Sequence, residues 1–176
     1  MEDAAAWYEI QSNPEVVRYL DWPLRDAKES LEHLKHRTQH TVLLQAGDFL
    51  ALAIESEGIV VGDVSLHLRD VRNRRVEMGW VLNPAHSGRG YATEAAAAVA
   101  TFAFEHLNAH EITAVIRPGN ERSIALATRL GFVGEPEEML LTRERFDSRP
   151  ALAYLTNETE ATTGPVPIVW PQPTVS

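Results

Sequence analysis

The segment from Val81 to Thr93, VLNPAHSGRGYAT, holds the residues of this chain that could most directly do chemistry. It places Gly88 and Gly90 in a polar loop, and an alanine-rich stretch that predicts a long helix follows at once. Glycines let backbone N–H groups approach an anion closely, and the first turn of a helix adds unpaired donors and a partial positive charge. The segment therefore favours a phosphate-binding loop, and a tight turn with a plain helix start is the alternative.

Two better-known phosphate-binding motifs do not fit this loop. A P-loop requires Gly-Lys followed by Ser or Thr, and no such sequence follows here. A dinucleotide-binding fingerprint requires a third glycine where Thr93 stands. The loop is therefore expected to bind a phosphate in some other structural setting.

A polar pair further along the chain adds to the pattern. Asn120 and Ser123 stand at the predicted start of a helix that Gly131 ends, one strand after the loop. The pair also has a simple structural interpretation, because Asn is a good N-cap and Ser can stand beside it in the first helical turn. Both interpretations remain open at this point.

Hydrophobic periodicity predicts the elements that must position these residues. Helices are expected at 3–10, 14–20, 26–40, 90–107 and 121–130, and strands at 49–55, 59–68, 74–83 and 111–117, with weaker strands near 138–141 and 151–156. Short turns separate the first three strands, so these strands predict an antiparallel meander. The later alternation of strand and helix requires at least one parallel pair with a right-handed crossover. The chain is therefore expected to adopt an α/β fold.

Composition narrows the function classes. The 176 residues fit one domain, which we place at 1–156, followed by a Pro- and Thr-rich tail at 157–176. The 16 Lys and Arg against 25 Asp and Glu give a net charge of −9, whereas nucleic-acid binders are usually basic. The chain has no cysteine, which excludes disulfides, thiolate metal sites and a cysteine nucleophile.

The sequence also bears on location. No apolar run approaches the ~18 residues that a membrane-spanning helix needs, and the acidic start Met1-Glu2-Asp3 does not look like a secretory signal. We therefore expect a cytoplasmic protein with no membrane partner, no nucleic-acid partner and no bound metal.

Taken together, these motifs resemble the GNAT superfamily of acyl-CoA-dependent N-acetyltransferases. The family's motif A, R/Q-x-x-G-x-G/A, aligns with the six residues from Ser87 to Ala92 and is matched at all but its first position. Motif B, N-x-x-S followed by Gly-Phe, is matched by Asn120, Ser123 and Gly131-Phe132. The segments NPEVVRYL (13–20) and EMGWVL (77–82) are similar to the RimJ/RimL branch of that family. The resemblance covers roughly residues 4–156.

The resemblance implies a mixed, mostly antiparallel sheet with helices on both faces, splayed between the strand ending near Asn83 and the strand at 111–117. Acetyl-CoA would lie there as co-substrate, with the Val81 N–H directed at the thioester carbonyl, where negative charge develops. By the same resemblance the expected cofactor contacts are Val81, Leu82, Asn83, Ser87, Gly88, Arg89, Gly90, Tyr91, Ala92, Thr93, Asn120 and Ser123.

Two side chains receive chemical roles from the resemblance. Glu77 stands where many family members carry a general base, and a structural strand carboxylate is the alternative. Ser123 would stabilise the leaving thiolate, and helix capping is its alternative. His67, with Asp63 and Ser65 on the same strand face, could line the acceptor site, but an ordinary strand histidine is the favoured interpretation.

Three departures from the family pattern stand out. Ser87 replaces the Arg or Gln that opens motif A, which removes one side-chain contact. Ala127 stands where many members carry a Tyr that acts as the general acid. Met1 leads almost directly into the first helix, so we expect the sheet to lack the family's usual first strand.

We interpret the chain as a GNAT N-acetyltransferase that moves the acetyl group of acetyl-CoA to a primary amine by direct attack. The acceptor would be a protein N-terminus or a small-molecule amine, and the acidic balance favours a cationic one. The alternatives are a catalytically weak CoA-binding regulatory module and an acyltransferase that uses a longer acyl-CoA. The resemblance is also compatible with a homodimer, because members of this family commonly form homodimers.

Two further clusters are expected to have no role in the reaction. The helical spacing of His33, His36 and His40 puts them on one helix face, and a solvated face is favoured over a metal site. The arginines between the second and third strands are expected to form a solvated hairpin, namely Arg69, Arg72, Arg74 and Arg75.

Overall fold

The computed structural model describes residues 3–149. The weak strand expected near 151–156, the domain boundary at 156 and the tail at 157–176 lie outside these residues.

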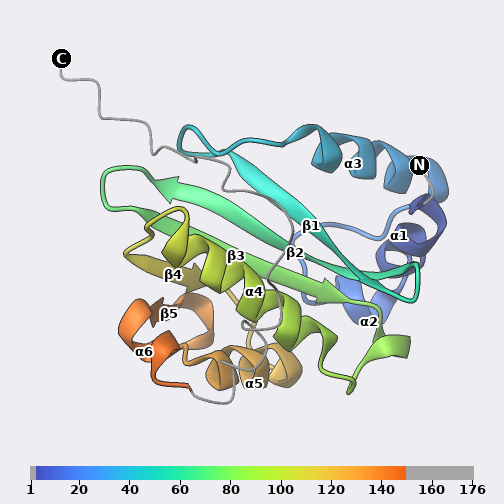
Figure 1. The fold of residues 1–176 in the computed structure, drawn as a ribbon. Helices are drawn as coiled ribbons and strands as arrows, with labels where there is room; N and C mark the ends of the chain where they lie inside the picture. Colours follow the sequence, from blue (N-terminus) through green and yellow to red (C-terminus); the bar gives the residue numbers. More distant parts are fainter. Residues whose placement is uncertain (1–2, 150–176) are drawn as a thin grey trace.

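Five strands form one mixed sheet in the order β1-β2-β3-β4-β5 (Figure 1). Antiparallel pairs join β1 to β2, β2 to β3 and β4 to β5, whereas β3 and β4 are parallel. The expected meander followed by one parallel pair is therefore confirmed. The strands are β1 (Phe49–Ser56), β2 (Ile59–Asp70), β3 (Arg75–Leu82), β4 (Glu111–Ala114) and β5 (Met139–Thr142).

The helices follow the predicted order with small changes in length. They are α1 (Ala4–Gln11), α2 (Pro14–Val17), α3 (Ala27–Gln39), α4 (Tyr91–Glu105), α5 (Glu121–Leu130) and α6 (Arg143–Asp147), with 3-10 turns η1 (Pro84–His86) and η2 (Pro136–Glu138). The helix predicted to reach residue 20 ends at Val17, because the next backbone bonds close tighter turns, with Leu20 N donating to Val17 O at 2.9 Å. The short α6 was not predicted.

Local capping explains where α3 begins. The Asp26 side chain accepts from the Glu29 N–H, and the Glu29 carboxylate accepts from the Asp26 N–H, both at 2.9 Å. This reciprocal pair is the capping box that the sequence pattern indicates. It fixes the start of a helix whose Arg37 side chain reaches Asp63 on the sheet.

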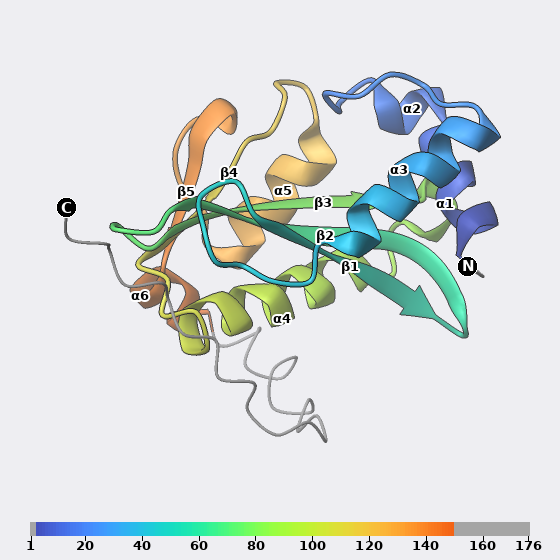
Figure 2. The same ribbon diagram turned by 90° about the horizontal axis from the view of Figure 1, so that it is seen from above.

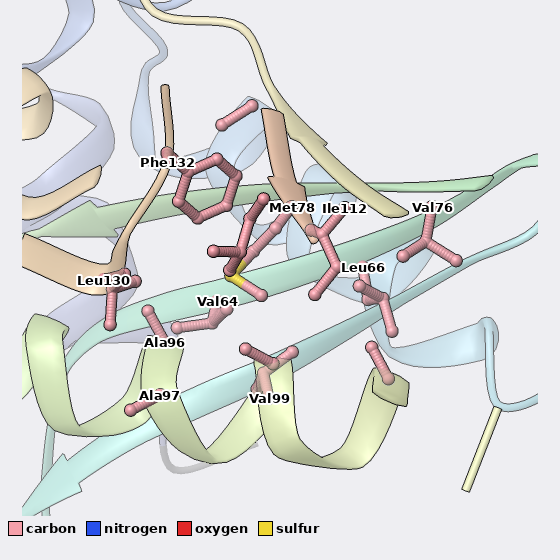
Figure 3. Close-up of a cluster of buried hydrophobic side chains, with 14 of the residues drawn as sticks. Val64, Leu66, Val76, Met78, Ala96, Ala97, Val99, Ile112, Leu130 and Phe132 are labelled. Atoms are coloured by element: carbon pink, nitrogen blue, oxygen red, sulfur yellow. The ribbon is translucent and has the colours of Figure 1, made fainter. Parts of the chain in front are cut away.

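The helices cover both faces of the sheet, as expected. Figure 2 shows α4 on one face and α1 and α3 on the other. Small side chains let α4 approach the sheet closely, and Figure 3 shows Ala96 and Val99 directed at Val64, Met78 and Ile112. The opposite face holds a smaller cluster that contains Trp7, Ile10, Val16 and Val81.

Within residues 3–149 no strand precedes α1. The first strand of the described range, β1, follows three helices in the sequence and forms one edge of the described sheet.

Candidate functional site

β3 and β4 pair only over their first residues. The parallel register runs from Arg75 opposite Glu111 to Glu77 opposite Thr113. β3 then continues to Leu82, bonded on one side to β2 and lacking a strand on the other within the described sheet. We call this second side, over residues 78–82, the open edge of β3. Glu77 is thus the last paired residue before the open edge.

Two backbone hydrogen bonds show which side of β3 each N–H group faces. Asn83 N donates to Val61 O at 2.8 Å, on the β2 side. His110 N donates to Arg74 O at 2.9 Å, on the β4 side. Backbone groups alternate between the two edges of a strand. Odd-numbered residues of β3 therefore bond toward β2, and even-numbered residues face the open edge.

This alternation corrects the expectation for the thioester contact. The N–H groups of Val81 and Asn83 point to β2 and are not free for a pantetheine arm, whereas those of Trp80 and Leu82 lie along the open edge. Asn83 has a structural role as well, because its side chain accepts from Ala85 N at 3.1 Å and caps η1. The sequence predicts a strand here but not which neighbour each N–H group meets.

The loop after η1 has the backbone shape expected of an anion site. Gly88 and Gly90 have positive φ angles of 80° and 87°, a region that favours glycine. No described atom lies within 4 Å of a Cβ added at either position, so the space beside both glycines is open. Ser87 N donates to Pro84 O at 3.1 Å, so of the predicted Ser87 contacts only the hydroxyl is left.

The start of α4 supplies unpaired donors beside this loop. Glu94 N makes the first helical bond, to Gly90 O at 3.0 Å. The preceding N–H groups have no partner inside the helix, as at every helix start, and the helix dipole makes this end partly positive. The predicted phosphate contacts at Gly88, Arg89, Gly90, Tyr91, Ala92 and Thr93 therefore meet at one helix terminus.

A basic residue that the sequence did not single out lies at the same terminus. Arg129 of α5 donates to Thr93 Oγ1 at 3.0 Å, across 36 residues of sequence. With Arg89 in the loop it adds positive charge where phosphates would bind. Only the packing of α5 beside α4 reveals it.

The motif B residues lie beside the open edge. Asn120 Oδ1 accepts from Ser123 N at 3.3 Å, so Asn120 is the N-cap of α5, as its structural interpretation predicts. Ser123 Oγ accepts from Trp80 Nε1 at 3.3 Å. The Trp80 ring packs edge-on against buried Phe132, with centroids 6.3 Å apart. The indole N–H therefore bonds to one lone pair of the Ser123 oxygen, and the hydroxyl proton of Ser123 is left free to donate to another acceptor.

Glu77 belongs to a row of side chains on the sheet face that α3 covers. The strand registers align Phe49, His67, Glu77 and Thr113 across β1 to β4. Both Glu77 carboxylate oxygens accept from Arg69, at 3.0 Å each. The hairpin arginines are exposed, as expected of a solvated hairpin, and two of them also form ion pairs, Arg69 with Glu77 and Arg75 with Glu111.

His67 is an uncharged member of this row at neutral pH. Burial lowers the pKa of His67 to about 4, and the nearby Arg69 and Arg37 guanidinium groups add to this. Its Nε2 lies 3.2 Å from Ser65 Oγ, and its ring stacks on Phe49. This contact agrees with the favoured interpretation of His67 as a satisfied strand histidine.

Asp63 forms a buried ion pair with Arg37. Arg37 of α3 donates to Asp63 Oδ2 at 2.5 Å, and their side chains are only 9% and 10% exposed. Burial raises the pKa of Asp63, and the Arg37 charge opposes that rise. Arg37 also lies over the ring of Trp7. Asp63 therefore fixes α3 to the sheet and offers no free carboxylate to an acceptor.

The segment after α2 crosses to the loop between β4 and α5. Tyr19 OH donates to Gly119 O at 2.9 Å, and Arg117 pairs with Asp21 at 2.6 Å. These contacts place residues 18–21 next to the start of α5, where Ser123 lies. They explain why the NPEVVRYL segment and motif B form one region despite about 100 residues between them.

Of the three histidines along α3, His36 is exposed as expected of a solvated face, whereas His33 departs from that expectation. His33 is half-buried, stacks on Trp7 with ring centroids 6.0 Å apart, and lies 2.5 Å from Gln11 Nε2. Its burial, together with the Arg25 and Arg37 charges, lowers the pKa of His33 to about 4.

Within residues 3–149 no group of three or more His, Asp or Glu could hold a metal ion. No helix in the described range is long and apolar enough to cross a membrane.

The lowered pKa values of two histidines predict that the stability of the fold depends on pH. His33 and His67 have a pKa of about 4 in the folded protein and one near 6.5 when unfolded. Between these values the unfolded chain binds protons that the folded chain does not, so stability should fall as pH drops from about 6.5 to about 4. NMR titration of the imidazoles should give midpoints near 4, and His67→Asn should flatten the dependence of the melting temperature on pH. Midpoints near 6.5 for both would contradict this.

Comparison with known proteins gives a matching family model and several relatives. Residues 1–133 match the family model of an acetyltransferase (GNAT) domain. The chain is 29% identical over 156 residues to an uncharacterized N-acetyltransferase, p20, from Bacillus licheniformis, covering 88% of this chain and 86% of that relative.

Solved structures share the fold at low identity. RimJ from Mycobacterium smegmatis, in complex with CoA-disulfide, has a TM-score of 0.67 at 20% identity, covering 89% of this chain and 84% of that one. A spermidine N-acetyltransferase from Vibrio cholerae, in complex with CoA and spermine, has a TM-score of 0.65 at 20% identity, with coverages of 82% and 92%.

Proposed function

Because this chain belongs to the GNAT acetyltransferase family, we propose that it transfers the acetyl group of acetyl-CoA to a primary amine by direct attack of the amine on the thioester. The observation that supports this most strongly is the open edge of β3, which begins directly after Glu77 and leads to the loop at Gly88 and Gly90. One end of this arrangement suits a phosphate and the other holds a carboxylate.

The phosphate end fits the CoA pyrophosphate. Open space beside both glycines lets an anion reach the backbone, and the unpaired N–H groups at the start of α4 are donors of the right kind. Arg89 and Arg129 add positive charge. Ser87 contributes its hydroxyl only.

The thioester end uses the backbone of β3. The N–H groups of Trp80 and Leu82 lie along the open edge and would pair with the pantetheine arm and the thioester carbonyl. Donors held by a strand need no reorganisation when negative charge develops on that oxygen, so they stabilise the transition state more than the ground state. This assignment replaces the one made to Val81.

The acceptor end must handle one proton for each turnover. An aliphatic amine arrives as an ammonium ion and has to lose a proton before its nitrogen can bond to the acetyl carbon. Glu77 accepts this proton, directly or through a water molecule. As the C–N bond forms and the C–S bond breaks, the nitrogen loses its second proton and the leaving thiolate takes up one, so CoA departs as the thiol. The proton on Glu77 then passes to solvent, which balances the reaction.

Ser123 stabilises that thiolate. With a lone pair occupied by Trp80 Nε1, its hydroxyl proton is free to donate to sulfur. We expect Ser123→Ala to lower kcat about 10- to 100-fold, the value of a hydrogen bond to a charged group. Thr128→Ala on the same helix removes a hydroxyl bonded to Ile124 O and should leave kcat unchanged. If steady-state kinetics showed an unchanged kcat in both variants, Ser123 would have only a structural role, at the start of α5.

The acceptor is either the α-amine of a polypeptide or a small-molecule amine. A similar structure belongs to a spermidine N-acetyltransferase, which makes polyamines natural candidates. The net charge of −9 also favours a cationic acceptor. The test is a panel of peptides with free N-termini, polyamines and monoamines, each incubated with acetyl-CoA or a longer acyl-CoA and examined by mass spectrometry. An N-acetylated amine supports the proposal, and its absence across the panel contradicts it.

A further inference from the structure

The ion pair between Arg69 and Glu77 has no part in the proposed mechanism as described. Arg69 Nε and one terminal nitrogen each donate to a different oxygen of Glu77, at 3.0 Å. This two-pronged geometry is the strongest that a guanidinium and a carboxylate can adopt. It engages the same carboxylate that an incoming ammonium ion would approach.

Exposure separates this ion pair from its neighbour on the same sheet face. The side chains of Arg69 and Glu77 are 46% and 25% exposed. Those of Arg37 and Asp63 are 9% and 10% exposed, so neither can change partner without leaving a buried charge unpaired. A partly exposed pair is solvated and costs less to separate than a buried one, so another ion can take the place of one partner. The pair of Arg75 with Glu111 is equally exposed, at 46% and 22%. Of these two exchangeable carboxylates, only Glu77 adjoins the open edge of β3.

We propose that Arg69 is an internal competitor for the acceptor's ammonium group and thereby helps to determine which amines this protein accepts. Its guanidinium holds the place of the ammonium ion at Glu77, and a charged acceptor binds only by displacing it. An uncharged amine does not need the carboxylate in order to bind and leaves Arg69 in place. The inference rests on the proposed function, in which Glu77 receives the acceptor.

The test compares two acceptors of similar size and different charge. At pH 7, 2-phenylethylamine is an ammonium ion, whereas O-benzylhydroxylamine is uncharged. In Arg69→Gln the KM of the charged acceptor should fall about two- to fivefold, as expected for loss of a partly exposed ion pair. The KM of the uncharged acceptor should not change. Arg72→Gln removes the same charge from the same hairpin and should leave both values unchanged.

A double variant shows whether Arg69 acts through Glu77. In the Glu77→Gln background the carboxylate is gone, so adding Arg69→Gln should no longer change the affinity for the charged acceptor. A fall in kcat for both acceptors in Arg69→Gln would instead make Arg69 a group that positions Glu77, and would overturn the inference. An equal change in KM for both acceptors would overturn it too.

Direct binding separates this inference from the proposed reaction. The dissociation constant of 2-phenylethylamine can be measured by calorimetry on the CoA-bound protein, where no turnover occurs. Tighter binding in Arg69→Gln, with no acetylated product when acetyl-CoA replaces CoA in a separate assay, would support the role of Arg69 and contradict the proposed function. An unchanged dissociation constant, or no binding to either variant, would overturn the inference.

Discussion

Replacing Gly90 with Glu should weaken acetyl-CoA binding by at least about 100-fold. Gly90 has a φ angle of 87° at the start of α4, where the proposed pyrophosphate site lies. A carboxylate about 4 Å from a phosphate costs about 4 kcal/mol at the effective dielectric of a protein surface, and each 1.4 kcal/mol is about tenfold in affinity. Calorimetric titration with acetyl-CoA measures this loss.

Two further glycine variants separate charge from backbone strain. Gly90→Ala keeps the left-handed strain, about 1–2 kcal/mol, but adds no charge, so it should bind acetyl-CoA more tightly than Gly90→Glu. Gly47→Glu adds the same carboxylate at another positive-φ glycine with open space, in the loop before β1. It should bind acetyl-CoA as the parent does. Equal binding by Gly90→Glu and the parent would remove the phosphate loop from the account.

Glu77→Gln should lower kcat by about 10²- to 10⁴-fold, the usual contribution of a positioned general base. Glutamine has nearly the shape of glutamate but cannot accept a proton from the acceptor amine. The affinity for acetyl-CoA should be unchanged, because Glu77 lies at the other end of the open edge from the phosphate loop. Steady-state kinetics with a saturating amine, together with calorimetry for acetyl-CoA, checks both statements.

Glu111→Gln is the matched control for that experiment. Glu111 is also a strand glutamate paired with an arginine, Arg75, and lies on the neighbouring β4. The substitution removes the same charge without touching the last paired position before the open edge. If both variants lost the same activity, the effect of Glu77→Gln would reflect lost ion pairs and not proton transfer.

The elements of this fold were largely predictable because their signals are local. The span Glu121–Leu130 and its glycine end at Gly131 follow from a capping residue and a residue that tolerates positive φ. Alanine-rich sequence predicts α4 in the same way. The five residues of α6 (Arg143–Asp147) are too few to show helical periodicity, which explains why that helix was missed.

The details of the site depend on contacts that no local signal records. The register of β3 decides whether the N–H group of Val81 or those of its neighbours face the open edge. A shift of one residue would turn the Val81 N–H to the open edge and those of its neighbours to β2. Trp80 meets Ser123 across 43 residues, and Arg129 meets Thr93 across 36. Motif spacing could find Ser123 and Glu77 by type. Only the packed structure shows that an indole orients one and a guanidinium holds the other.

Whether this protein acetylates an amine by direct attack is decided by the stoichiometry of products when it is incubated with acetyl-CoA and an amine that it binds. Mass spectrometry should find one N-acetylated amine for each CoA released, no acetyl group left on the protein, and no acetylated product when the amine is omitted. Acetyl-CoA that binds but yields no acetylated amine would contradict the account, and so would transfer through an acetylated protein.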